Sequence, residues 1–239
     1  MQVWGITHCG AVRKQNQDSF AAKLLEDGRA LGLVCDGMGG ALAGNVASSM
    51  AVELFMEQFL ASDPGAEDQE RLQHAAAVAN AQVFQRSKED QECMGMGTTL
   101  VAALAGESMA TVINEGDSRA YHITPQGITL ITRDHSLVED LVRRGDLTRE
   151  EAKRHPNKNL ITRALGAEPV LMTDCFRQEL AEGEYLLLCS DGLSNVVEEQ
   201  EMLYEVIHGG GNDSCCQRLL DIALERGAPD NVTAVLIRR

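Results

Sequence analysis

The sequence predicts an α+β fold in which antiparallel sheets pack under helices. Segments typical of strands are grouped together and do not alternate strictly with helices, which argues against a doubly wound parallel sheet. Apolar residues make up 44% of the 239 residues and aromatic residues only 4%, so the core is expected to be aliphatic. A chain of this length, without repeats or a Pro/Ser-rich linker, suits a single domain over residues 1–239.

The first third of the chain combines two strands with two long helices. An alternating segment at 2–7 and an apolar run at 30–35 predict the strands. One helix is indicated by an apolar stripe that recurs every four residues, at Ala47, Ala51, Phe55 and Phe59. The second helix is expected at about 68–88. The polar stretch 62–71 is interpreted as the loop between them.

The rest of the chain returns to strands, with helices at three places. Strands are expected at 98–104, 109–114, 119–123, 128–132, 170–178, 185–189 and 232–237. Helices are expected at 136–154, 198–208 and 213–226. The first of these is split at Gly145, and Thr148 with Glu151 forms a capping-box pattern for its second piece. His155-Pro156 ends that piece.

Composition excludes several classes of protein. The net charge of −15 disfavours nucleic acid and anionic membranes as partners. Seven cysteines without a C-x-x-C spacing indicate a reducing compartment, and we expect the cytoplasm. The N-terminus does not resemble a signal peptide, and no apolar run approaches the 18 residues of a membrane span.

Four aspartates stand where a strand begins or ends: Asp36, Asp117, Asp191 and Asp230. Each one taken alone is more often part of a turn than a ligand. However, buried strands run directly into Asp36 and Asp191. If these strands are neighbours in one sheet, their carboxylates meet at one rim and repel each other unless cations neutralise them. Mg²⁺ and Mn²⁺ prefer such oxygen ligands, and a pair of ions would hold a phosphoryl group and activate water.

Glycines and one arginine extend this hypothesis. Gly37, Gly39 and Gly40 let the backbone turn tightly beside Asp36, and the carbonyl of Gly37 could face a metal. The spacing of a nucleotide-binding P-loop is absent. Arg13 could grip phosphate through its bidentate fork, or it could be an exposed basic residue beside Lys14.

Eight ordered motifs resemble those of one family. They are THCGAVRKQNQDSF, DGMGG, MGTTL, EGDSRAY, TRDHS, HPNKNLITRALG, LLLCSDGL and APDNVTAVLI. Their order is similar to that in the metal-dependent (PPM, type 2C) serine/threonine protein phosphatases, most of all the compact bacterial members. The resemblance implies an α-β-β-α sandwich with two central antiparallel sheets, flanking helix pairs, two catalytic Mn²⁺ or Mg²⁺ ions and room for a third.

The resemblance also implies roles for individual residues. Asp36 would bridge both catalytic ions, the carbonyl of Gly37 would bind one of them, and Asp191 and Asp230 would bind the other. Asp18 would reach the metal shell through water.

Further roles follow from the same resemblance. Asp117 would bind a third, weaker ion. Arg13 would bind the phosphate, which reverses the residue-level preference for an exposed side chain. Asn231, after the last metal aspartate, would contact substrate. The segment 136–164, here called the flap, would border the site.

Three positions depart from the family pattern. Gln17 replaces a frequent glutamate, so one nearby carboxylate is missing. Met38 stands where eukaryotic members often have a histidine that is proposed to protonate the leaving group. Asn195 replaces a carboxylate common in relatives, which weakens the case for a third ion.

The mechanistic hypothesis is direct attack on phosphorus by a water or hydroxide that bridges two ions. The partners would be phosphorylated proteins and a cognate serine/threonine kinase, and the protein is expected to be a monomer. The alternative is a non-catalytic module of the same fold that binds phosphoproteins. No G-x-S-x-G, C-x5-R or zinc spacing is present. His135 and His155 are either structural or placed near the flap.

Overall fold

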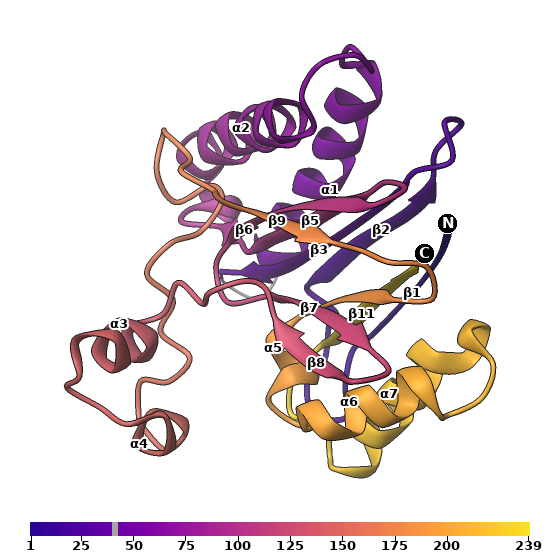
Figure 1. Ribbon diagram of the computed structural model, residues 1–239. Helices are drawn as coiled ribbons and strands as arrows, with labels where there is room; N and C mark the ends of the chain where they lie inside the picture. The colour runs from indigo at the N-terminus through magenta and orange to yellow at the C-terminus, as the bar shows by residue number, and fades with distance from the viewer. Residues whose placement is uncertain (40–42) are drawn as a thin grey trace.

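The computed structural model describes residues 1–39 and 43–239. Two antiparallel sheets lie face to face between two pairs of helices, with the two termini close together at one side (Figure 1). This confirms the predicted α-β-β-α sandwich. In the described part of the chain, no helix is long and apolar enough to cross a membrane. Gly40 lies outside the described residues, so its predicted role is not addressed.

The first sheet has five strands in the order β1-β11-β10-β7-β8. Its strands are β1 (Gln2–His8), β7 (Arg119–Thr124), β8 (Gly127–Leu130), β10 (Tyr185–Cys189) and β11 (Val232–Arg238). The central strands β10 and β11 are buried along almost their whole length, as their near-continuous apolar sequences predict. The centre of this sheet is therefore mostly aliphatic.

The second sheet has the order β2-β3-β5-β6-β9, with a short strand β4 that pairs with the end of β3. Its strands are β2 (Asp18–Leu24), β3 (Ala30–Met38), β4 (Gly97–Thr98), β5 (Leu100–Ala105), β6 (Met109–Glu115) and β9 (Asp174–Glu179). Helices α1 (Ala43–Ala61) and α2 (Asp68–Glu89) cover its outer face. The predicted stripe of α1 is fully buried there, including Phe55 and Phe59.

The remaining helices cover the five-stranded sheet or leave the sandwich. Helices α6 (Glu199–Ile207) and α7 (Cys215–Glu225) lie under the five-stranded sheet. Helix α5 (Asp191–Ser194) is a single turn directly after β10. Helices α3 (Leu137–Arg144) and α4 (Arg149–Lys153) form the protruding lobe in Figure 1. Short 3-10 turns occur at Gln91–Cys93 and Asn212–Ser214.

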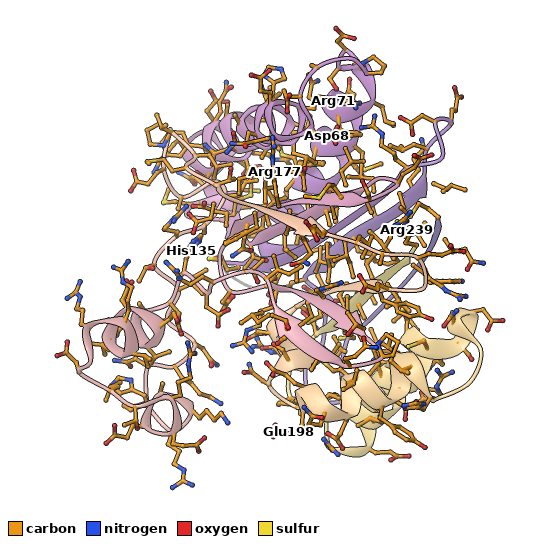
Figure 2. All side chains as sticks on the ribbon, in the orientation of Figure 1. Asp68, Arg71, His135, Arg177, Glu198 and Arg239 are labelled. Carbon is orange, nitrogen blue, oxygen red and sulfur yellow. The ribbon has the colours of Figure 1, made fainter. Side chains whose placement is uncertain are left out.

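Three hydrophobic layers hold these elements together: α1 and α2 on the second sheet, the two sheets on each other, and the first sheet on α6 and α7. Figure 2 shows how densely side chains fill the spaces between these layers, whereas the lobe of α3 and α4 stands apart. None of the residues in α3 or α4 is fully buried. The lobe therefore depends on the chain segments that connect it to the sandwich.

Several predicted boundaries were wrong. Strand β2 was missed, because its sequence DSFAAKL alternates weakly and leaves Leu24 exposed. Residues 170–173 do not join β9, since they form a loop held on α2 through Asn80, which donates to the carbonyl of Glu168. The predicted strand 98–104 is divided at Thr99, and β8 ends at Leu130. Helix α2 begins at residue 68, so the loop before it spans only 62–67.

The proposed convergence within one sheet was also wrong. The strands that lead to Asp36 and Asp191 are β3 and β10, and these belong to different sheets. Strand β3 also continues two residues beyond Asp36, because Gly37 and Met38 pair with β4. The carboxylates therefore meet across the interface between the sheets.

Candidate metal centre

Two threonine side chains hold Asp36 in place through hydrogen bonds with its backbone amide and carbonyl. Its amide donates to Oγ1 of Thr99 at 2.8 Å, and its carbonyl accepts from Oγ1 of Thr98 at 2.9 Å. On the neighbouring strand, Asp18 lies directly opposite Asp36 in the antiparallel register. Residues directly opposite in such a ladder point to the same side of the sheet. The two carboxylates therefore project together toward the facing sheet.

Asp18 connects the two sheets. Its Oδ2 accepts hydrogen bonds from Oγ of Ser190 and Oγ1 of Thr233, both at 2.7 Å. Ser190 follows β10 and Thr233 lies in β11, so both donors come from the five-stranded sheet. The other oxygen, Oδ1, is buried and has no hydrogen-bond partner among the described residues. One oxygen of Asp18 is thus used structurally, and the other is left for a further ligand.

Asp191 and Asp230 are brought together because β10 and β11 are antiparallel neighbours. Asp191 follows β10, and Asp230 precedes β11 at the same end of the sheet. Nδ2 of Asn195 donates to Oδ2 of Asp191 at 3.1 Å, and Oδ1 of Asp191 is buried without a partner in the described part of the chain. Oδ2 of Asp230 accepts from Arg13 at 2.8 Å.

A cavity of about 290 Å³ is common to most of the predicted site residues. Its lining includes Arg13, Asp36, Gly37, Asp117, Asp191, Asp230 and Asn231. Asp18 does not line this cavity; it lies beneath the surface and is only 5% exposed. Met38, predicted to be unable to supply a proton, also borders the cavity. The structure therefore gathers residues that are far apart in the sequence, such as Arg13 and Asp230, which are separated by 217 positions.

Burial and mutual repulsion dominate the electrostatics of the cavity. Burial raises the pKa of Asp36 well above its ordinary value, and the nearby charges of Asp18 and Asp191 raise it further. Burial likewise raises the pKa of Asp18 to about 6 and that of Asp117 to about 7. The pKa of Asp191 is also raised, first by burial and then by Asp230. These carboxyls are unfavourable as bare anions, which is the condition that divalent cations relieve.

The donor set fits hard cations that keep part of their water. No group of three or more His, Cys, Asp or Glu side chains in residues 1–39 and 43–239 forms a ready-made cage. Mg²⁺ and Mn²⁺ do not require one, because such ions are commonly held by one or two carboxylates with water completing the shell. The unpartnered oxygens of Asp18 and Asp191 are consistent with ligands of this kind.

Gly37 can only be glycine at this position. A Cβ placed on it would lie 2.0 Å from the carbonyl oxygen of Gly44 and 2.6 Å from that of Gln17. The amide of Gly37 donates to the carbonyl of Gln17 at 3.0 Å. This close approach of three backbone segments explains the glycine next to Asp36 without reference to a metal. The metal-binding role of its carbonyl stays a prediction.

Asn231 holds the loop that carries Arg13. Its Oδ1 accepts from the amide of Gln17, and its Nδ2 donates to the carbonyls of Cys9 and Gln15, at 2.8, 2.9 and 2.9 Å. The predicted substrate contact of Asn231 stays a prediction, since its amide is already engaged by these three backbone groups. The side chain of Arg13 is half exposed and reaches the cavity through Asp230.

Several residues of the site were not singled out in the sequence. Ser190, Thr233 and Thr99 hold Asp18 and Asp36, and Asn159 and Ile161 border the cavity from the flap. Serines and threonines within strands carry no distinctive spacing. Their role becomes visible only when the missed strand β2 places Asp18 against the facing sheet.

A larger cleft of about 610 Å³ opens from this cavity and lies between the flap and the body of the sandwich. Both hollows are bordered by Asp117, Asn159 and Asp191. The flap contributes Val138, Val142 and charged residues of α4 to the cleft wall. An elongated ligand that reaches the carboxylates would therefore extend along the flap.

A sandwich with clustered carboxylates at the junction of its two sheets defines the class of metal-dependent phosphatases. The family model "Protein phosphatase 2C" matches residues 7–219. The chain is 36% identical to "Serine/threonine phosphatase stp" of Listeria monocytogenes over 236 residues, which cover 98% of this chain and 94% of that protein. The chain belongs to the protein phosphatase 2C family and is a protein serine/threonine phosphatase.

Solved structures agree with this assignment. The crystal structure of the phosphatase Stp1 from Staphylococcus aureus matches with a TM-score of 0.94 and 34% identity, covering 100% of this chain and 94% of that one. The catalytic domain of the phosphatase PstP, solved with two manganese ions, matches with a TM-score of 0.87 and 33% identity. That match covers 98% of this chain and 96% of that domain.

Proposed function

We propose that this phosphatase hydrolyses phosphoserine and phosphothreonine in proteins without forming a covalent intermediate. Two Mn²⁺ or Mg²⁺ ions, held by the carboxylates of the cavity, would supply Lewis acidity and an activated water as the nucleophile for direct hydrolysis. The single observation that carries the proposal is the gathering of Asp36, Asp117, Asp191 and Asp230 around one cavity with Arg13 at its edge.

The residues are assigned by their place in the cavity. Asp36, which lines the cavity with the other carboxylates, would serve both ions, and the carbonyl of Gly37 would serve one of them. Asp191 and Asp230 would hold the other ion, and Asp117 would hold a third. Asp18 would act from beneath the cavity, because two hydroxyl donors occupy its Oδ2 and its Oδ1 has no partner among the described residues.

Arg13 and Asn231 would bind and position the phosphate at the edge of the cavity. A guanidinium beside developing negative charge stabilises the equatorial oxygens of the transferred phosphoryl group. In the structure Arg13 pairs with Asp230, so substrate binding exchanges a carboxylate partner for a phosphate partner. Asn231 sets the position of the Arg13 loop and lines the same cavity, where it would contact the phosphate.

The flap cleft supports a protein substrate over a small metabolite. A phosphate ester at the carboxylates would leave the adjoining cleft of about 610 Å³ for the residues on either side of the phosphorylated one. Residues 1–239 would form one catalytic domain with the flap as its substrate-facing part. The substrates would be products of a serine/threonine kinase.

The cellular compartment and the oligomeric state of the enzyme are also proposals. All seven cysteines are unpaired thiols, and burial raises the pKa of Cys35, Cys189 and Cys216. Unreactive, reduced cysteines suit the cytoplasm. We propose a cytoplasmic monomer. The alternative of a non-catalytic phosphoprotein-binding module is favoured by no observation in the structure.

The experiment compares hydrolysis of p-nitrophenyl phosphate and of a phosphothreonine peptide with Mn²⁺, with Mg²⁺ and with a chelator. Activity is expected only with metal. The peptide should have the lower KM, because it alone fills the flap cleft. Activity that persists in chelator would overturn the proposal, and equal KM values would remove the role of the cleft.

A further inference from the structure

His135 and Gly116 form a reciprocal pair of hydrogen bonds. The amide of His135 donates to the carbonyl of Gly116 at 2.9 Å, and the amide of Gly116 donates to Nδ1 of His135 at 3.0 Å. Gly116 is the residue before Asp117, and the hydrogen bond from its amide to His135 is buried. The imidazole therefore binds the backbone that carries one of the site carboxylates.

On the side away from His135, Thr99 packs closely against the backbone of Gly116. Its φ of +107° lies in the region that favours glycine, and an added Cβ would lie 2.7 Å from Cγ2 of Thr99. Thr99 in turn accepts from the amide of Asp36, and its hydroxyl lies 2.7 Å from that of Ser118. The loop of Asp117 is thus held between Thr99 and His135.

His135 is also where the flap begins. The amide of Thr162, at the far end of the flap, donates to the carbonyl of His135 at 2.8 Å, and Ser136 pairs with Ile161. Figure 2 shows His135 at the connection between the sandwich and the lobe of α3 and α4. Both ends of the flap therefore meet at this residue.

A second set of contacts reinforces the same junction. Arg163, just beyond Thr162, binds Glu115 at 2.9 Å and Asp174 at 3.0 Å. Nε2 of His135 faces Oδ2 of Asp174 at 3.2 Å, although it has no well-aligned hydrogen bond among the described residues. The stronger contact of the ring is therefore the one that Nδ1 makes with Gly116.

The neutral ring suits this geometry. Nδ1 can accept a hydrogen bond only without a proton, which places the single ring hydrogen on Nε2 toward Asp174. Burial lowers the pKa of His135, and this effect outweighs the opposing contact with Asp174. The acceptor is thus available at neutral pH.

We propose that His135 is a positioning residue that couples the flap to the loop of Asp117. Through Nδ1 it fixes the Gly116 amide, and through its backbone it fixes both ends of the flap. Asp117 and the flap cleft are thereby held in register. The consequence for catalysis rests on the proposed function, whereas the mechanical coupling does not.

The test uses two amides that replace different halves of the imidazole. In His135→Asn, the amide oxygen can occupy the place of Nδ1 and still accept from Gly116. In His135→Gln, the longer side chain reaches the place of Nε2 and leaves the Gly116 amide without its acceptor. His122→Gln is the control, because His122, a residue of β7, pairs with Glu184 and does not line the flap cleft.

The first readout is backbone amide exchange in the metal-free protein. His135→Gln should exchange about tenfold faster at 115–118 and in the flap, since one buried hydrogen bond is lost. His135→Asn should stay near the wild type. If the Asn and Gln variants exchange alike, or if neither changes 115–118, the coupling is refuted.

The second readout is activity. His135→Gln should need about five- to tenfold more Mn²⁺ for half-maximal activity and show a higher KM for a phosphothreonine peptide. Its kcat for p-nitrophenyl phosphate at saturating Mn²⁺ should change less. His135→Asn should restore both values, which a residue needed only for stability would not do.

The two readouts fail separately. If the wild type lacked metal-dependent activity, the proposed function would fall and the exchange result would still stand. If His135→Gln did not fold, the wild type would decide the question, because the proposal requires the Gly116 amide to be among its slowly exchanging amides. Fast exchange there would overturn it.

Discussion

Asp18 and Asp36 face each other directly across the β2–β3 ladder, so two carboxylates, one buried and one partly buried, occupy one cross-strand position. Like charges directly opposite in a sheet are destabilising. Hydroxyl donors from the other sheet stabilise only one oxygen of Asp18. The fold therefore keeps a repulsive pair at the junction of its sheets, and bound cations would relieve this repulsion.

Asp36→Asn should lower Mn²⁺-dependent kcat by about 10²-fold or more, because it removes the carboxylate proposed to serve both ions. In the metal-free protein the same change should raise Tm, since it removes a buried charge repelled by its neighbours; each kcal/mol gained corresponds to about 2–4 °C. Steady-state kinetics and thermal melts measure both effects. Asp221→Asn, on the exposed side of α7, is the matched control. Full turnover by Asp36→Asn would contradict the metal assignment.

The metal-free protein should lose stability between pH 5 and pH 8. The pKa of Asp18 is raised to about 6 and that of Asp117 to about 7, so the native state binds more protons than the unfolded state in this range. Stability from a raised pKa is complete below the unfolded pKa and is lost as the pH rises through the folded pKa. For Asp18, which is almost fully buried, the total loss from about pH 4 upward is on the order of 3 kcal/mol, and about half of it falls above pH 5.

Thermal melts from pH 5 to 8, with and without Mn²⁺, measure this loss. Mn²⁺ should raise Tm far more at pH 8 than at pH 5, because protons compete with the ion for the same oxygens. Asp18→Asn should flatten the pH dependence of the metal-free protein. A metal-free Tm that rose steadily across this range would be incompatible with the raised pKa values.

Ser190→Ala and Thr233→Val should each weaken metal binding by about 10–100-fold, although neither side chain lines the cavity. Each removes a hydroxyl that holds Oδ2 of Asp18, and the native state should lose about 1–3 kcal/mol. Calorimetric Mn²⁺ titration and denaturant unfolding measure the two effects. Thr111→Val, at a buried threonine of β6, provides the comparison. Unchanged Mn²⁺ affinity in both variants would show that Asp18 plays no part in the metal shell.

Arg13→Lys should lower kcat/KM by about tenfold or more, because an ammonium keeps the charge but loses the bidentate fork. Stability should change by less than about 1 kcal/mol, since the Arg13–Asp230 pair is partly exposed. Inhibition by inorganic phosphate should weaken in parallel. A variant with normal phosphate inhibition would exclude Arg13 from the phosphate site.

The strongly patterned elements were predictable from local sequence. The stripe of α1, the capping box at Thr148 and Glu151, and the apolar strands β10 and β11 follow from spacing alone, because each pattern matches one periodicity. Strand β2 was not predictable in this way. Its residues are mostly half-buried, so its place depends on pairing with β3.

The site was predictable only in part. Asp36 and Asp191 stood out because apolar strands lead into them. Asp18 was recognised by resemblance, and its hydroxyl partners Ser190 and Thr233 by nothing in the sequence. The hydroxyls of Ser190 and Thr233 donate to Asp18, which lies 172 and 215 positions away in the sequence. No local sequence pattern indicates contacts over such separations.

The sequence by itself determined most of the strands and helices, the identity of the acidic residues and the family to which the chain belongs. Only the tertiary structure decided that β3 and β10 lie in facing sheets, so that Asp36 and Asp191 meet across the sandwich. It also decided that His135 accepts a hydrogen bond from the amide of Gly116, the residue before Asp117. The physical reason is that hydrophobic burial is encoded locally by periodicity, whereas the pairing of sheets and the satisfaction of buried polar groups depend on contacts between distant segments.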